Sequence, residues 1–251
     1  MLRRVAACLF VAVAASLAAS DGPKAGDEAL GTQRYDSFER PAACATCHVD
    51  ITRQHEQAMM SQAYTHHWDE IEYFELALPH AAREPRVAGI KAGCNGCHAP
   101  LAFLAGDIPP KPPSANTRAN ESVSCDLCHT ILAKKGDVPV NYNFVVQPGR
   151  TKQGPREGVV SPHHITVMNP FLRTAEFCGQ CHNEQDSWGL YVKSTHLEWK
   201  EGPHGRAGIV CQECHMPPAP GRSAVMGAER PDVRQHLFHG EQDAGKLRGV
   251  V

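Results

Sequence analysis

Residues 121–130 read ESVSCDLCHT, in which two cysteines separated by two residues are followed at once by a histidine. A single Cys-x-x-Cys pair can bind zinc, exchange disulfides or, when a histidine follows, anchor haem c through covalent bonds. How often the pattern recurs in the rest of the chain decides among these chemistries.

The pattern Cys-x-x-Cys-His occurs five times in the 251 residues, and only Cys8 lies outside it. Zinc ribbons need cysteine pairs but no histidine directly after each second cysteine, and disulfide frameworks do not favour one fixed pentapeptide. The five copies predict five covalently bound haem c groups, each with two attachment cysteines and a proximal histidine. These residues are Cys44, Cys47 and His48; Cys94, Cys97 and His98; Cys125, Cys128 and His129; Cys178, Cys181 and His182; and Cys211, Cys214 and His215.

The N-terminus has the pattern of a secretory signal peptide. Arg3 and Arg4 precede an apolar, alanine-rich run at 5–19, and cleavage is expected near Ser20. The run is short for a membrane span, so an uncleaved anchor is the alternative. Export would place the protein in the periplasm or at the extracellular surface. The expected divisions are a signal peptide at 1–20, a flexible N-terminal segment at 21–40 and a single pentahaem domain at 41–251.

Composition limits the possible partners and the kind of core. The formal net charge of −2 gives no indication of a nucleic-acid partner. After loss of the signal peptide, roughly 46 residues remain for each haem, too few for five separate domains. The haems are therefore expected to share walls and to replace much of the side-chain core. The residues predict a helix over 49–78, a Pro-rich connector at 108–113, a short strand at 141–146, a loop at 149–164 and a structural break at 216–221.

The ligand opposite each proximal histidine decides between electron transfer and catalysis. Two strong axial ligands make an electron carrier, whereas an open iron face admits a small molecule. Ten histidines lie outside the motifs for at most five positions, so the sequence alone does not assign them. A methionine ligand would raise the reduction potential relative to two histidines, although core packing is its commoner role. The distal candidates are Met60, His80, His163, His164, His196 and His236.

Several longer segments resemble multihaem cytochromes of the cytochrome c-554 type, and the resemblance runs from Pro41 to about Gly240. The segments are SVSCDLCH (122–129), NPFLRTAEFCGQCHN (169–183), EWKEGPH (198–204), IVCQECHMP (209–217) and RQHLFHG (234–240). The last resembles the family's terminal His-x-Phe segment, which favours His236 as a ligand.

One departure from the family pattern follows the first motif. The family has a helix containing Gln-Trp and then an axial histidine, but here His55 replaces the tryptophan and Met60 stands where that histidine would fall. The resemblance therefore leaves Met60, His55, His66 and His67 as alternatives for one iron.

The resemblance implies a mostly α fold with extensive irregular loops and very little β-structure, wrapped around haems in stacked and perpendicular pairs. It also implies electron transfer between redox partner proteins, with no catalytic residue. One alternative is an oxidoreductase acting on a small nitrogen or sulfur compound at one five-coordinate haem. The other is a subunit of a haem filament, and docking to an outer-membrane complex or homo-oligomerisation is also compatible with the sequence. The donor, the acceptor and the potentials are not encoded in any recognisable motif.

Overall fold

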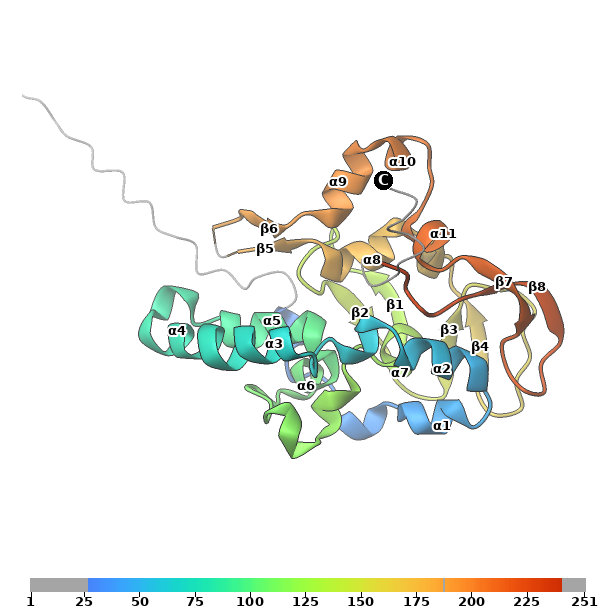
Figure 1. Cartoon of the computed structure of the whole chain (residues 1–251), viewed down its shortest axis with the longest axis horizontal. Helices are drawn as coiled ribbons and strands as arrows, with labels where there is room; N and C mark the ends of the chain where they lie inside the picture. Colours follow the sequence, from blue (N-terminus) through green and yellow to red (C-terminus); the bar gives the residue numbers. More distant parts are fainter. Residues whose placement is uncertain (1–26, 187, 241–251) are drawn as a thin grey trace, which may run out of the picture.

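The computed structural model describes residues 27–186 and 188–240 (Figure 1). The expected signal peptide and the last eleven residues lie outside these ranges. Among the described residues, no helix combines the length and the apolar character needed to cross a membrane.

Short helices carry most of the regular structure. Proline occupies the first position of three of them, where its fixed φ suits the first turn and no N–H is needed. The helices are α1 Pro41–Ala45, α2 Val49–Glu56, α3 His67–Glu70, α4 Leu78–Arg83, α5 Ile90–His98, α6 Pro100–Ala105, α7 Cys125–Cys128, α8 Ala175–His182, α9 Thr195–Glu201, α10 Pro203–Arg206 and α11 Cys211–His215.

The β-structure of the described residues is confined to four two-stranded sheets. Three pairs are antiparallel and one, β3 with β4, is parallel. The predicted class, mostly helical with irregular loops and little β-structure, is therefore confirmed. The strands are β1 Ile131–Lys134 with β2 Phe144–Val146, β3 Thr151–Gly154 with β4 Ile165–Met168, β5 Glu184–Gln185 with β6 Tyr191–Lys193, and β7 Pro218–Arg222 with β8 Glu229–Arg234.

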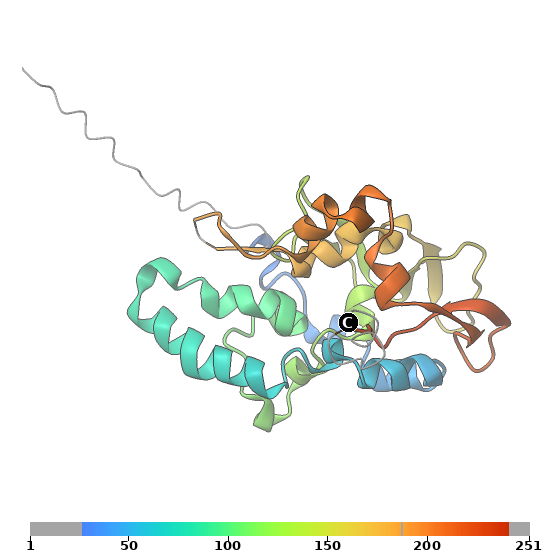
Figure 2. The same cartoon turned by 45° about the horizontal axis from the view of Figure 1, so that its top comes forward.

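The helix predicted over 49–78 is broken into separate pieces. After α2 the chain turns at Ala58, which is extended and fully buried. It becomes helical again at α3, continues through a π-helix at Ile71–Ala77 and ends with α4. This continuous rod lies beside α5 in both views (Figures 1 and 2). The Tyr73 hydroxyl ties it to α5 by donating to the Lys91 carbonyl at 2.5 Å.

The central apolar cluster corrects the prediction that residues 21–40 form a free segment. From residue 27 onward this part of the chain packs on the cluster, to which it contributes Ala29 and Phe38. The thiols of Cys97, Cys128 and Cys181 border the cluster, so three of the five motifs surround one core. The other buried members are Leu101, Phe103, Leu104, Val123, Leu127, Ile131, Tyr142 and Phe144.

Candidate haem-binding site

The five Cys-x-x-Cys-His motifs, numbered motif 1 to motif 5 in chain order, each occupy a helical turn. Motifs 2 to 5 lie on α5, α7, α8 and α11. In motif 1, His48 N–H donates to the Cys44 carbonyl at 2.9 Å and closes the same turn. Residues i, i+3 and i+4 of a helix share one face, so the two thiols and the imidazole of each motif project together. All ten cysteines carry free thiols, as attachment to haem requires.

Four of the five motif histidines are oriented by a hydrogen bond from Nδ1 to a backbone carbonyl. A carbonyl oxygen only accepts, so Nδ1 carries the proton and Nε2 keeps a lone pair. This is the form in which a second partner fixes a metal-binding histidine. The bonds run from His48 to Ser223 at 2.5 Å, His98 to Ala63 at 2.8 Å, His129 to Gln153 at 2.7 Å and His215 to His239. The residues present therefore fit haem c.

The motif 4 histidine is kept neutral by its surroundings. Burial, followed by the charges of Lys193, His215 and His98, lowers the pKa of His182 to about 4. A neutral imidazole is the form that binds metal. The same interactions bring the histidines of motifs 2, 4 and 5 into one neighbourhood.

His98 of motif 2 has a second partner. Asp69 Oδ1 lies 3.1 Å from its Nδ1, which also donates to the Ala63 carbonyl. Burial lowers the pKa of His98, but the bonds to Asp69 and Ala63 raise it by more, and the pKa lies above its ordinary value. The carboxylate therefore favours a proton on Nδ1.

Two motif histidines face a histidine from a distant part of the chain. The ring centres of His48 and His164 lie 6.2 Å apart, and those of His129 and His236 lie 6.4 Å apart, with interplanar angles of 24° and 26°. With a metal–nitrogen bond of about 2 Å on each side and roughly 1 Å from nitrogen to ring centre, two imidazoles on one metal have centres about 6 Å apart. Both pairs have the separation that one iron between them would require.

His196 is a buried candidate of a different kind. Its backbone N–H donates to Asn183 Oδ1 at 3.0 Å, and its ring lies against Gly179 of motif 4. Its Nε2 is buried without a hydrogen-bond partner. Buried nitrogen atoms are normally satisfied, so this one is suited to a ligand.

The other predicted distal candidates lie in less specific surroundings. Met60 packs against the central apolar cluster, and its carbonyl accepts from Val123 N–H. His80 on α4 and His163 before β4 are exposed. The structure therefore brings His164 and His236 up to motif histidines and leaves His80 and His163 at the surface.

Two further alternatives for the first iron have other partners. His55 is buried, and its Nε2 lies 2.9 Å from the Val123 carbonyl. His66 Nδ1 lies 3.9 Å from Asp69 Oδ2, which places His66 on the Nδ1 side of His98.

Thiols from different motifs meet in three places. A hydrogen bond with Cys125, followed by burial, raises the pKa of Cys44, and this contact joins motifs 1 and 3. Corresponding bonds join motif 2 to motif 4 and motif 4 to motif 5, through Cys97 with Cys181 and Cys178 with Cys211. Haems attached at these positions would lie side by side.

Tyr142 sits where motifs 2, 3 and 4 converge, and the sequence did not single it out. It belongs to the segment predicted as a strand, but Asn141 and Tyr142 have φ of 51° and 56°, and the strand begins only at Phe144. Tyr142 N–H donates to the Gln180 carbonyl at 2.7 Å, and a Cβ on Gly96 would lie 3.1 Å from Tyr142 Cβ. Burial, and then thiols from all three motifs, raise the pKa of Tyr142, so the buried hydroxyl stays protonated.

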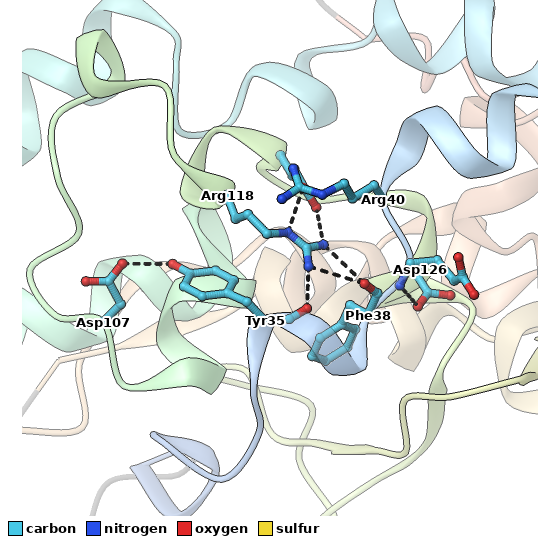
Figure 3. Close-up of polar contacts among 8 residues, drawn as sticks. Tyr35, Phe38, Arg40, Asp107, Arg118 and Asp126 are labelled. Atoms are coloured by element: carbon cyan, nitrogen blue, oxygen red, sulfur yellow. Dashed lines mark hydrogen bonds and ion pairs between the residues drawn. The ribbon is translucent and has the colours of Figure 1, made fainter.

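A polar network attaches the N-terminal segment beside motif 3 (Figure 3). Arg118 pairs with Glu121 at 2.8 Å and donates to the Tyr35 and Phe38 carbonyls. Figure 3 also shows the contacts of Asp107 and Asp126 with this segment.

Asp126 lies inside motif 3 and has a buried carboxylate. It accepts from Glu39 N–H at 2.7 Å and forms an ion pair with Lys152 of β3. The residue after Lys152 is Gln153, whose carbonyl orients His129. Asp126 therefore links motif 3, the segment before motif 1 and the support of a proximal histidine.

Three comparisons find related proteins. Residues 43–130, which contain the first three motifs, match the family described as cytochrome c554 and c-prime. The chain is 26% identical over 203 residues to a cytochrome c-552 of Aliarcobacter butzleri (strain RM4018), a match that covers 72% of this chain and 36% of the relative. It is similar in fold to the penta-heme cytochrome c552 from Thermochromatium tepidum, with a TM-score of 0.56 and 19% identity over 86% of this chain and 60% of the other. The chain thus spans about a third of the curated relative.

Proposed function

We propose that this multihaem c-type cytochrome carries electrons between redox partner proteins through five haem c groups, one at each motif. When bound, haem c supplies one-electron chemistry at its iron. The observation that carries the proposal is the contact between motifs, which runs from motif 1 to motif 3, through the surroundings of Tyr142 to motifs 2 and 4, and from motif 4 to motif 5.

The protein's own residues would bind and orient the cofactors. The ten cysteines provide the attachment points, and backbone carbonyls fix Nε2 of four motif histidines toward the iron position. The ring separations support His164 as the distal ligand at motif 1 and His236 at motif 3. Burial holds the pKa of His236 at about 4, so this ligand is neutral.

Motif 5 is the proposed contact point for a partner protein. Cys214 is exposed, whereas the other nine thiols are partly covered, and His215 also lies at the surface. A group attached there would lie closest to solvent and to a docked redox protein. The proposed location is the periplasm or the extracellular surface, in agreement with the signal-peptide pattern.

Electron-transfer kinetics of the purified holoprotein test the proposal. The pyridine haemochrome should give five haems per chain, and the reduced protein should pass all of its electrons to a small acceptor cytochrome in a stopped-flow experiment. Fewer than five haems would contradict the stoichiometry. Binding of CO or nitrite by the reduced protein, with turnover of nitrite, would instead favour the oxidoreductase alternative.

A further inference from the structure

Asp69 distinguishes the motif 2 histidine from its counterparts. The Nδ1 partners found for His48, His129 and His215 are backbone carbonyls, which are neutral. His98 Nδ1 lies 2.8 Å from the Ala63 carbonyl and 3.1 Å from Asp69 Oδ1, so its proton is shared with a carboxylate.

The fold brings this carboxylate to motif 2 from a separate element. Asp69 belongs to α3, at the start of the rod that lies beside α5, and α5 ends with His98. The Asp69 side chain is 23% exposed and that of His98 is 36% exposed, so water screens the contact only in part. His66 also approaches the same carboxylate, with its Nδ1 at 3.9 Å from Oδ2.

A carboxylate behind a metal-binding histidine makes the imidazole a stronger electron donor. It accepts the Nδ1 proton in a charge-assisted hydrogen bond, which is shorter and stronger than a bond to a neutral acceptor, and raises the basicity of the ligand nitrogen. A more basic axial ligand stabilises ferric over ferrous iron, and axial ligands with their hydrogen bonds are main determinants of haem potential.

We propose that Asp69 is a positioning residue that makes His98 the most electron-donating proximal ligand of the protein and so lowers the reduction potential at motif 2. The inference rests on the proposed haem at that motif. It does not depend on which partner proteins exchange electrons with the chain.

The test replaces Asp69 by asparagine in the full holoprotein. Asp69→Asn keeps the shape and a neutral acceptor oxygen but removes the charge. Partners of metal ligands contribute about 10- to 100-fold, and a tenfold change corresponds to 59 mV for one electron. Spectroelectrochemical titration should therefore show one of five components moving upward by about 60 to 120 mV, with four unchanged. Asp107→Asn is the matched control, because Asp107 bonds the Tyr35 hydroxyl at 2.9 Å and contacts no motif histidine.

The outcomes separate this inference from the proposed function. Five haems with potentials unmoved by Asp69→Asn, or five components that all shift together, would overturn the role of Asp69 and leave electron transfer standing. Fewer than five haems in the wild-type protein would count against the proposed function itself. If Asp69→Asn loads only four haems, Asp69→Glu, which keeps the charge, provides the test. It should leave every component within 59 mV, a tenfold change, of its wild-type value, and a larger shift would overturn the inference.

Discussion

The buried ion pair between Asp126 and Lys152 is a strong test of how the site is held together. The Asp126 side chain is 1% exposed and that of Lys152 is 13% exposed. Asp126→Asn would remove the negative charge and leave the Lys152 ammonium poorly solvated. The loss of charge within motif 3 is expected to destabilise the whole fold, since Asp126 also holds Glu39 N–H.

The size of the effect follows from what each partner retains. Removing one member of a buried ion pair costs about 3–5 kcal/mol. Lys152 keeps its bond to the Gly149 carbonyl at 2.6 Å, and an asparagine oxygen can still accept from Glu39 N–H. We therefore expect the lower end, about 3 kcal/mol. At about 2–4 °C per kcal/mol for a protein of this size, Tm should fall by roughly 6–12 °C.

Thermal unfolding of the holoprotein, followed by circular dichroism at equal haem content, measures this change. Asp50→Asn is the control, because Asp50 pairs with Arg53 in an exposed bridge and should leave Tm unchanged. A double-mutant cycle with Lys152→Met isolates the pair. A fall in Tm below about 2 °C for Asp126→Asn, or strict additivity with Lys152→Met, would refute the reasoning.

Three other substitutions have defined outcomes. His236→Phe should convert one low-spin ferric signal in EPR into a high-spin signal while five haems are retained, because it removes the ring facing His129; an unchanged spectrum would show that His236 is not a ligand. Gly179→Ala should lower the free energy of unfolding in urea by about 1–3 kcal/mol, because its Cβ would lie 2.8 Å from the His196 ring; wild-type stability would mean that the ring moves freely. Tyr142→Phe should not lower Tm, because the buried hydroxyl has no partner within the chain; a clear fall would indicate a hydrogen bond to a bound group.

The attachment chemistry could be predicted from the sequence because it is local. Two cysteines and a histidine at positions i, i+3 and i+4 need only one helical turn to share a face, and the structure places all five motifs on such turns. The long-range pairs could not be predicted. His164 and His236 reach their motif histidines across more than a hundred residues, and no local pattern separates them from His80 or His163.

Packing overrode local propensity in two segments. The residues of 49–78 favour helix, but Ala58 is fully buried in an extended conformation and interrupts it. The prolines of 216–221 predicted the end of regular structure. Instead, Pro218 begins β7, which pairs with β8, because a two-stranded ladder leaves one edge on which a missing N–H costs nothing.

Low-temperature EPR of the fully oxidised holoprotein, with spin integration, tests the central claim most directly. If five haems form a closed electron carrier, all signals are low-spin, they integrate to five ferric irons per chain, and the reduced protein does not bind CO. A high-spin signal worth one iron, accompanied by CO binding on reduction, would contradict that account and identify an open iron face.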